Sequence, residues 1–372
     1  MTAETLSRRA LNRATLARQL LLRRADLPVL DTVEHLVGLQ AQVPLDPYTA
    51  LWSRLDGFRP GALADLLVER RVVRTVVMRG TIHLVTADDC LLLRPLVQPV
   101  LDAELARHRD YAPHLRELDL EPVLEFARTV FAERPRTGPE LRAALGERFS
   151  GHDGAALAYA CRCLLPLVQV PPRGVWGRTA AVATTTAESW LGRPLAERPS
   201  LDEVVLRYLA AFGPAAVADI GTWSRVTGLR EVVERLRPGL RTFRDERGRE
   251  LFDLPDAPRP DPASPAPARF LPEYDNVLLS HADRSRFVAP EERARLGGLA
   301  GRVQGAVLHD GFGWGVWRLE RDRDSGAATL VIGQLRRATK RATESVAAEG
   351  RRLLRFLAPE AESHDVRFAA DS

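Results

Sequence analysis

The sequence carries two carboxamides two residues apart, in Gln40-Ala41-Gln42, at the end of a helix predicted over residues 31–40. At a fraying helix end both amides can turn toward one space. A neutral amide oxygen can accept a hydrogen bond from water and place a negative dipole beside a developing cation. It is a poor base, so the pair suits reactions with a good leaving group. The alternative is that the amides bond backbone groups left free at the helix end.

Other common kinds of catalytic site find little support in the chain. Cys161 and Cys163 are separated by one residue, and adding His152 leaves a zinc set incomplete, so we expect no metal. The sequence has no HExxH, Walker, GxGxxG or GxSxG motif. A lyase that attacks through an amine has only Lys340 and the N-terminus available. With Cys90, the cysteines number three, which predicts reduced, buried thiols in a cytoplasmic protein.

The composition indicates a globular protein. With 372 residues, 45% hydrophobic and 27% charged, the chain is long enough for two or three domains. No stretch approaches the roughly 20 apolar residues of a membrane span, and the first residues do not resemble a secretory signal, so we expect no membrane partner. The net charge of +4 is a modest indication of polyanion binding. A GC-rich coding bias explains the abundance of arginine equally well.

The same order of elements recurs three times, namely helices followed by two β-rich runs. A basic amphipathic helix is predicted at residues 6–24. The repeats are predicted as helices 31–40, 48–55 and 61–71 with strands 72–78 and 81–86; helices 121–135, 136–149 and 155–165 with strands 167–170 and 174–177; and helices 201–212, 214–224 and 229–237 with strands 240–244 and 250–254. This order is typical of a winged helix-turn-helix.

The C-terminal part has a different composition. Residues 255–268 form a Pro/Ala-rich stretch, which predicts an extended linker. Strands are expected at 303–310, 313–321 and 328–335, followed by a basic helix at 336–357. The predicted fold is therefore α+β, with three tandem winged helix-turn-helix repeats, a C-terminal β-hairpin and helix module, and a concave basic face for DNA. The domains are predicted at residues 1–118, 119–198, 199–256, 257–268 (linker) and 269–372.

Four motifs, in the family's order and spread over nearly the whole chain, resemble the AlkZ/YcaQ family of winged-helix DNA glycosylases. They are Gly38–Gln42, Met78–Leu84, Leu271–Asn276 and Ser280–Arg284. The Gln-apolar-Gln pattern is that of the AlkZ type. The resemblance implies three winged helices around a basic concave face and no cofactor. It also implies hydrolysis of alkylated purines, including bulky adducts and interstrand crosslinks, with the catalytic role on Gln40 and Gln42.

The chemistry of the glutamine pair agrees with this resemblance. A guanine alkylated at N7 already carries a positive charge and leaves without a general acid, so the enzyme needs only to aim a water and stabilise the sugar cation. Asp46 is a stronger base four residues beyond Gln42, but we expect it to stabilise a turn before Pro47. The expected activity is that of a monofunctional DNA glycosylase for DNA repair and genotoxin self-resistance. Three modules in one chain favour a monomer on double-stranded DNA.

Further residues are predicted to contact DNA, each with a structural alternative. Arg79 and His83 on the first hairpin are predicted to contact phosphate or sugar, or to be an exposed arginine and a hydrogen-bonded histidine. Tyr274 and Asn276 belong either to a turn or to the site. The remaining predicted contacts are Arg284, in the fourth motif; Phe312 and Trp314, as a hairpin wedge or a buried cluster; and Arg336 and Arg337, on the basic C-terminal helix.

Two other functions remain open from the sequence. A winged-helix protein can be a non-catalytic DNA-binding regulator, although no dimerisation or effector segment is recognisable here. A protein that sequesters a genotoxic drug is the second alternative, and it would bind the free drug without DNA.

Overall fold

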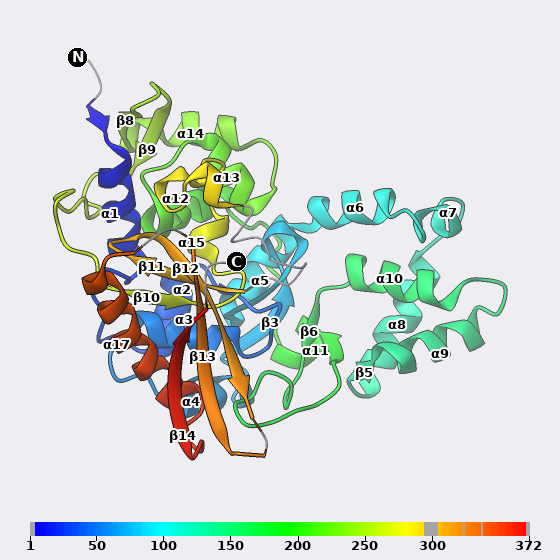
Figure 1. Cartoon of the computed structure of the whole chain (residues 1–372). Coiled ribbons are helices and arrows are strands. Elements are labelled where there is room, and N and C mark those ends of the chain that lie inside the picture. Colours follow the sequence, from blue (N-terminus) through cyan, green and yellow to red (C-terminus); the bar gives the residue numbers. More distant parts are fainter. Residues whose placement is uncertain (1–3, 294–303, 323, 336–337, 370–372) are drawn as a thin grey trace.

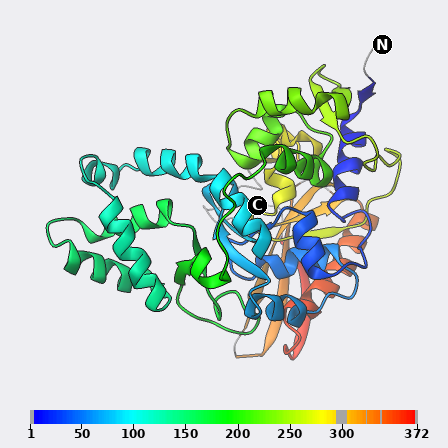
Figure 2. The ribbon, with the colours of Figure 1, turned by 180° about the vertical axis from the view of Figure 1, so that it is seen from behind.

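The computed structural model describes residues 4–293, 304–322, 324–335 and 338–369. Within these ranges the chain is α+β, as predicted, and its strands form three sheets. Figures 1 and 2 show one lobe of helices, from α6 to α10, that extends sideways from the rest of the molecule. No helix in the described ranges has the length and apolar character needed to cross a bilayer.

The first winged helix has the predicted order. It consists of α2 (Val29–His35), α3 (Asp46–Arg54), α4 (Pro60–Val68), β3 (Val72–Val76) and β4 (Ile82–Thr86). A short 3₁₀ turn, η1 (Met78–Gly80), joins the two strands at the wing. The chain begins with β1 (Thr5–Leu6) and α1 (Arg8–Arg18), and α1 is shorter than the predicted helix over 6–24. The backbone of Leu20 is left-handed, with φ of 58°, which ends the helical path.

The prediction that the glutamines end a helix is wrong. Helix α2 ends at His35, and the backbone then takes two left-handed steps, at Val37 (φ 53°) and Gly38 (φ 88°). A Cβ atom at Gly38 would lie 2.7 Å from a Val85 side-chain carbon, so this tight turn requires glycine. The turn directs the next residues into the sheet, where β2 (Leu39–Gln40) pairs with β4 in an antiparallel ladder.

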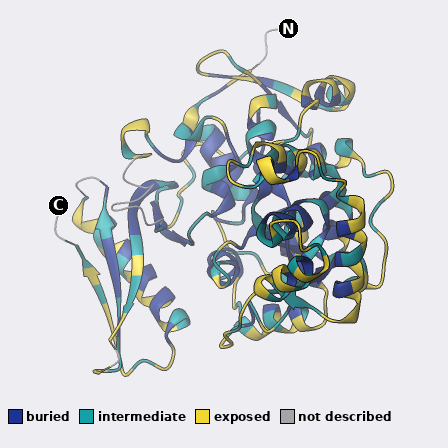
Figure 3. Cartoon of the chain, turned by 90° about the vertical axis from the view of Figure 1, so that its right-hand side faces the viewer, coloured by how far each residue is buried: buried dark blue, intermediate teal, exposed yellow. Residues whose placement is uncertain are grey.

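The second winged helix follows three helices that the sequence did not predict. These are α5 (Ala87–Leu96), α6 (Gln98–Arg107) and α7 (Ala112–Leu115). The repeat itself has α8 (Glu121–Glu133), β5 (Arg136–Thr137), α9 (Gly138–Arg148), α10 (Gly154–Leu164), β6 (Leu167–Gln169), β7 (Ala183–Thr186) and α11 (Ala187–Leu191). Thr137 and Glu140 form a capping box at the start of α9. Figure 3 shows that helices carry their buried residues on inward faces and their exposed residues on outer faces.

The predicted strand at residues 174–177 is wrong, because the second strand of this repeat is β7. Gly174 (φ 84°) and Gly177 (φ 71°) both adopt left-handed backbone, which places them in a loop instead of a ladder. Strand β6 pairs with β3 of the first repeat, so both repeats share one sheet with the order β2-β4-β3-β6-β7-β5. The two modules are therefore joined through the β3–β6 pair, and β2, which carries Gln40, forms one edge of the sheet.

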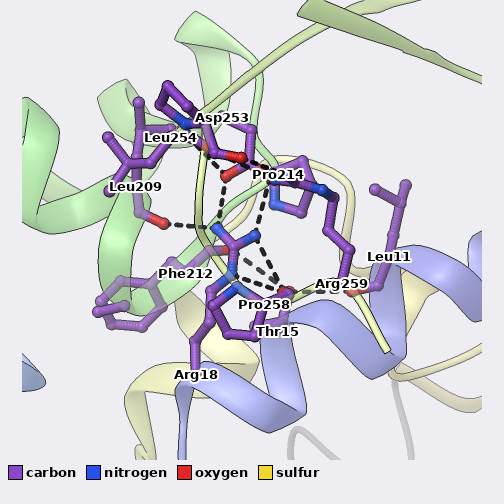
Figure 4. Close-up of polar contacts among 12 residues, drawn as sticks. Leu11, Thr15, Arg18, Leu209, Phe212, Pro214, Asp253, Leu254, Pro258 and Arg259 are labelled. Carbon is purple, nitrogen blue, oxygen red and sulfur yellow. Dashed lines mark hydrogen bonds and ion pairs between the residues drawn. The ribbon is translucent and has the colours of Figure 1, made fainter. Parts of the chain in front are cut away.

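The third winged helix matches its prediction closely. It contains α12 (Leu201–Phe212), α13 (Val217–Ser224), α14 (Leu229–Leu236), η2 (Arg237–Gly239), β8 (Arg241–Asp245) and β9 (Glu250–Asp253). Strand β1 adds to β8 in parallel, and α1 packs against this repeat. Figure 4 shows the buried Arg18 side chain of α1 paired with both carboxylate oxygens of Asp253, at 2.6 and 2.8 Å. A further Arg18 hydrogen bond goes to the carbonyl of Leu209.

The C-terminal module combines strands and a helix, as the sequence predicts, but its sheet has five strands, because β10 (Arg269–Leu271) and β14 (Ser363–Phe368) join the three predicted ones. Residues 254–268, which precede it, contain neither helix nor strand. The module contains β10 (Arg269–Leu271), α15 (Asn276–Leu279), η3 (Arg284–Arg286), η4 (Pro290–Glu292), β11 (Gly305–His309), β12 (Phe312–Arg321), β13 (Ala327–Gln334), α17 (Lys340–Leu357) and β14 (Ser363–Phe368). Val346, Leu353 and Leu354 of α17 pack against the buried face of the sheet, in one core with Phe270 and Leu330.

Candidate active site

Gln40 is held at the edge of the shared sheet by a cation. It lies opposite His83 in the ladder between β2 and β4, and only 7% of its surface is exposed. Its side-chain oxygen accepts a hydrogen bond from Nη2 of Arg79 at 2.7 Å. Because the guanidinium is only a donor, the oxygen of this amide must face it, and the orientation of the carboxamide is fixed.

Arg79 joins three separate parts of the chain. Its Nη2 group donates to Oδ1 of Asn276 at 2.9 Å and contacts Nε2 of His83 at 3.2 Å. Its Nη1 group donates to the backbone carbonyl of Trp223, in helix α13 of the third winged helix, at 3.1 Å. The backbone of Arg79 is left-handed, with φ of 61°, at the wing turn. The wing of the first repeat is therefore tied to the third repeat and to the 271–276 motif.

His83 supports Arg79 from inside the protein. The imidazole is fully buried, and Nδ1 lies 3.0 Å from the carbonyl of Thr81, so the proton belongs on Nδ1 and Nε2 faces the guanidinium. Burial, followed by the charge of Arg79, lowers the pKa of His83 to about 3. The ring is therefore neutral near pH 7. A side chain this buried has no surface for the DNA contact that we predicted for it.

Gln42 is exposed, in contrast to Gln40. Its side-chain oxygen accepts from the backbone N–H of Ile82 at 3.4 Å, which is a long hydrogen bond. The backbone of Ala41, the residue between the two glutamines, makes two hydrogen bonds. Its N–H donates to the carbonyl of Ile82, and its carbonyl accepts from Nη2 of Arg74 at 2.7 Å. One amide is therefore anchored in the protein and the other reaches solvent beside it.

Arg74 is a residue of this site that the sequence did not suggest. It lies in the middle of β3, is 1% exposed, and holds the Ala41 carbonyl. Burial, followed by the nearby Arg173, lowers the pKa of its guanidinium to about 10. The signal in the sequence was an arginine within the apolar run Val72–Met78, where a buried charge requires a specific partner.

The 271–276 motif is both a turn and part of the site. Asp275 caps helix α15 and pairs with Arg54, with two contacts of 2.8 Å inside the protein. Asn276 is 4% exposed and donates from Nδ2 to the Gly38 carbonyl at 3.1 Å, while its oxygen accepts from Arg79. Tyr274 is half-buried with a left-handed backbone. The ion pair thus fixes the turn that places Asn276 beside Gln40.

Asp46 is the first residue of α3, close to the 271–276 motif. Its Oδ2 atom is buried and has no hydrogen-bond partner among the described residues. Burial first, followed by the charges of Glu273 and Asp275, raises the pKa of the Asp46 carboxyl to about 8. A carboxyl with this pKa is mostly protonated at pH 7 and is a poor choice for a resident general base.

Two further cationic side chains lie near Arg79. Arg225, exposed after α13, and the half-buried Arg284 both lower the pKa of Arg79, after the larger effect of burial, so each is close to its guanidinium. The resulting pKa of about 10 leaves Arg79 charged at pH 7. Arg284 was predicted from its motif. Arg225 was not, because no pattern marks an arginine at the end of a short helix.

The wedge predicted for Phe312 and Trp314 does not fit the structure. The turn before β12 packs against α1, where Arg9 and Arg13 pair with Asp310. Trp314 is 3% exposed within the C-terminal core, its ring 6.1 Å from that of Phe368.

Phe312 is half-buried, with the guanidinium of Arg8 5.2 Å from its ring centre. The alternative that we had considered, a buried aromatic cluster, describes Trp314. Arg336 and Arg337 lie outside the described residues.

The described part of the chain shows no site suited to metal or thiol chemistry. No group of three His, Cys, Asp or Glu side chains gathers there in a way that would hold a metal ion. Cys90, Cys161 and Cys163 are free and buried, as expected. Burial raises the pKa of the Cys90 and Cys161 thiols to about 12, which leaves them unreactive.

The arrangement of the winged-helix repeats is shared with a DNA glycosylase of known structure. The solved structure of the DNA glycosylase AlkZ of Streptomyces sahachiroi has the same fold, with a TM-score of 0.79 at 23% identity over 98% of this chain and 100% of that one. The model of the DNA glycosylase AlkZ-like family matches residues 33–356, and the chain belongs to that family. It is therefore a DNA glycosylase, and its substrate is DNA, as the motifs indicated.

A protein that is similar in sequence also comes from Streptomyces sahachiroi. A protein named interstrand DNA cross-link repair glycosylase, from Streptomyces sahachiroi, is 27% identical over 331 residues. The similarity covers 81% of this chain and 85% of that protein.

Proposed function

We propose that the protein hydrolyses the N-glycosidic bond of cationic purines alkylated at N7, and that Gln40 and Gln42 carry the catalysis. The observation that supports this most strongly is the anchored carboxamide of Gln40, fixed by Arg79 beside the exposed carboxamide of Gln42. Enzymes gain rate from polar groups that are already oriented before the reaction begins. One anchored amide beside one exposed amide, with the Asp46 carboxyl mostly protonated at pH 7, suits a substrate whose leaving group is activated in advance.

Each glutamine has a distinct role in the proposed mechanism. Gln42 reaches solvent, and its oxygen has a second lone pair beyond the long hydrogen bond from Ile82, so it accepts from the attacking water. Gln40 also keeps a second lone pair, which places a negative dipole beside the sugar cation as the purine leaves. The neutral purine departs with the bonding electrons, the water adds its hydroxyl to the anomeric carbon of the sugar, and the remaining proton is released to solvent. Each oriented group contributes about two to three decades of rate.

The DNA backbone provides the counter-charge in this proposal. Arg225 and Arg284, close to Arg79, bind phosphates that flank the lesion. Arg79 already donates to Gln40, Asn276 and the Trp223 carbonyl, and in this proposal it acts mainly by positioning. Phosphate binding at this place keeps the cationic guanidinium from repelling the cationic substrate.

Bulky adducts and interstrand crosslinks are the proposed lesions. The exposure of Gln42 supports this, because an exposed catalytic group accepts a lesion that a closed pocket would exclude. The name of the relative supports it independently. We propose a role in DNA repair and self-resistance to a genotoxin, performed by a monomer in the cytoplasm. The free, buried thiols support the assignment to the cytoplasm. The presence of three winged helices in one chain supports the monomer.

The test uses two duplexes, one with a single 7-methylguanine and one crosslinked through two purine N7 atoms. Wild type is expected to release free base from both and leave abasic sites. The double variant Gln40→Ala/Gln42→Ala is expected to bind both duplexes and release base at least about a hundredfold more slowly. Tight, sequence-selective binding to undamaged DNA without release would instead indicate a regulator. Equal release by the variant would reject the catalytic assignment.

A further inference from the structure

A cavity of about 640 Å³ lies between the shared sheet and helices α9 and α10 of the second winged helix. Its size falls within the range of small-molecule sites in proteins. The sheet contributes side chains of β3, β4 and β6, such as Val76, Ile82 and Leu167. The helices contribute Ala158 and Tyr159 from α10 and Leu141 from α9. No step of the proposed hydrolysis uses this space.

The cavity wall lies next to the candidate catalytic segment. Ile82 lines it, and the backbone N–H of the same residue donates to Oε1 of Gln42 at 3.4 Å. Arg74 also lines it, and its Nη2 group holds the carbonyl of Ala41. Two residues therefore bind the glutamine segment and form a wall of the cavity. The cavity wall therefore lies beside the place that we propose for the purine, at Gln42.

The charges of the lining select the chemistry of the occupant. Four arginines, Arg74, Arg94, Arg142 and Arg162, line the cavity, and its lining contains no acidic side chain. Arg162 is paired with Glu104, and Arg94 donates to backbone carbonyls, but neither contact makes the lining negative. A cationic purine would be repelled there. The site suits an uncharged or anionic group.

The remaining lining favours an apolar, aromatic occupant. Tyr159 stacks obliquely on Tyr111, with ring centres 5.0 Å apart, and both line the cavity. Val182, also part of the lining, is 38% exposed and adds apolar surface to the cavity. Aromatic rings and arginine guanidinium groups both bind planar π systems well.

We propose that this cavity binds the non-nucleoside arm of a bulky N7-purine adduct, as an uncharged or anionic aromatic group. The inference rests on the proposed function and adds a specificity site to it. The arm occupies the space between sheet and helices while the alkylated purine lies at Gln42. Adducts with an aromatic arm are then released faster than adducts of equal size whose arm does not fit the cavity. A methylated base leaves the cavity empty.

The experiment compares 7-methylguanine with a 7-(pyrenylmethyl)guanine adduct in the same duplex. Ala158→Trp adds an indole within the cavity wall, and Ala348→Trp, at an exposed position on α17, is the matched control. Single-turnover release of the pyrenylmethyl base is expected to fall at least about tenfold in Ala158→Trp, equivalent to about 1.4 kcal/mol. Release of 7-methylguanine is expected to stay within about twofold in both variants.

The outcomes separate the cavity from the catalytic proposal. An equal loss on both substrates, or no loss on either, overturns the cavity assignment and leaves the glutamine mechanism standing. If wild type releases neither base, the proposed function fails and the inference fails with it. If Ala158→Trp does not fold, Val182→Glu, at the exposed position of the lining, replaces it as the test. Its carboxylate puts a charge where the apolar arm would pack, so release of the pyrenylmethyl base is expected to fall while release of 7-methylguanine is unchanged.

A third substrate checks the sign of the charge preference. A 7-(3-trimethylammoniopropyl)guanine adduct carries a permanent cation on its arm. Wild type is expected to release it more slowly than the pyrenylmethyl adduct, and Ala158→Trp is expected to leave its rate unchanged. Faster release of the cationic arm, with loss in Ala158→Trp, would overturn the assignment of charge.

Discussion

Arg79 holds the side-chain oxygen of Gln40 at 2.7 Å, although the two residues stand 39 positions apart in the sequence. The same Nη2 group reaches Asn276, 197 positions further along the chain. One guanidinium thus donates hydrogen bonds to a side-chain amide of the first winged helix and to another in the C-terminal motif. An amide side chain has several rotamers, and this arrangement removes that freedom before substrate binds.

Replacement of Arg79 by lysine should separate orientation from charge. Lysine retains the positive charge but lacks the planar fork that reaches Gln40, Asn276 and the Trp223 carbonyl together. We expect release of 7-methylguanine to fall by about one to two decades. Single-turnover kinetics at saturating enzyme measure it. Arg355→Lys, at an exposed position of α17, is the control, and equal rates in both variants would show that the fork is unimportant.

Acid should destabilise the protein through two buried histidines. Burial is the main cause that lowers the pKa values of His83 and His281 to about 3, from 6.5. Between these values the unfolded chain binds protons that the folded protein does not. The free energy of unfolding therefore falls as pH falls through this window, by about 1.4 kcal/mol per pH unit for each histidine.

The variant His83→Gln tests this directly. Urea titrations between pH 6 and pH 5 should show a pH dependence of stability weaker than wild type by about 1.4 kcal/mol per pH unit. His152→Gln, at an exposed position, is the control. An unchanged slope in His83→Gln would mean that the ring is protonated in the folded state.

Asp46 should have the opposite pH dependence. Its carboxyl pKa is raised from 3.8 to about 8, mainly by burial, so the folded protein keeps a proton that the unfolded chain loses between these values. Stability falls as pH rises through this window. Asp46→Asn mimics the protonated form, and it should be more stable than wild type at pH 8.5 by more than about 1 kcal/mol.

The comparison with pH 5 completes this test. At pH 5 the wild-type carboxyl is already protonated in the folded state, so the gain from Asp46→Asn should be much smaller. Urea unfolding at both pH values measures the difference, with Asp56→Asn at an exposed position as control. A gain that does not grow with pH would show that Asp46 is ionised in the folded protein.

The buried pair of Arg18 and Asp253 should dominate the attachment of α1 to the third winged helix. Both side chains are at most 1% exposed, so removing the cation leaves a buried carboxylate with only Arg259 beside it. Arg18→Met should lower the free energy of unfolding by about 3–5 kcal/mol.

The matched variant is Arg128→Met, because Arg128 pairs with Glu121 at the surface with both side chains more than half exposed. It should cost less than about 1 kcal/mol. Urea unfolding with far-UV circular dichroism compares the two. Similar losses in both variants would contradict the importance that we assign to burial.

The repeat order could be predicted from the sequence because each winged helix is encoded locally. Helix α12 was predicted residue for residue, and strands β8 and β9 to within a residue or two, because apolar periodicity and turn residues mark them. The prediction of a strand at residues 174–177 was wrong because a short apolar run between glycines resembles a strand even when the backbone of the glycines is left-handed. Helices α5–α7 were missed because they carry no repeat signal.

The site could be predicted in its residues but not in its geometry. The motifs identified Gln40, Gln42, Arg79 and Asn276, and the structure brings Gln40, Arg79 and Asn276 into hydrogen-bond contact. The catalytic and DNA-binding roles of these residues stay predictions. Local patterns could not show that Gln40 lies in a strand, because that depends on the turn at Gly38 and on pairing with β4.

The cavity could not be predicted from the sequence for the same reason. Strands β3 and β6 come from different repeats, and their pairing across 92 positions, marked by Thr75 and the Leu167 carbonyl, creates the wall that both share. Single-sequence patterns describe each repeat alone. They carry no information on the surface formed where two repeats meet.

The central claim is that uncharged amides suffice because the departing base is already activated. It is tested most directly by single-turnover release of 7-methylguanine and of hypoxanthine, a neutral base, from otherwise identical duplexes. We predict release of 7-methylguanine by wild type, a loss of at least about a hundredfold in Gln40→Ala/Gln42→Ala, and no release of hypoxanthine by either protein. Comparable release of both bases by wild type, or undiminished release of 7-methylguanine by the variant, would contradict this account.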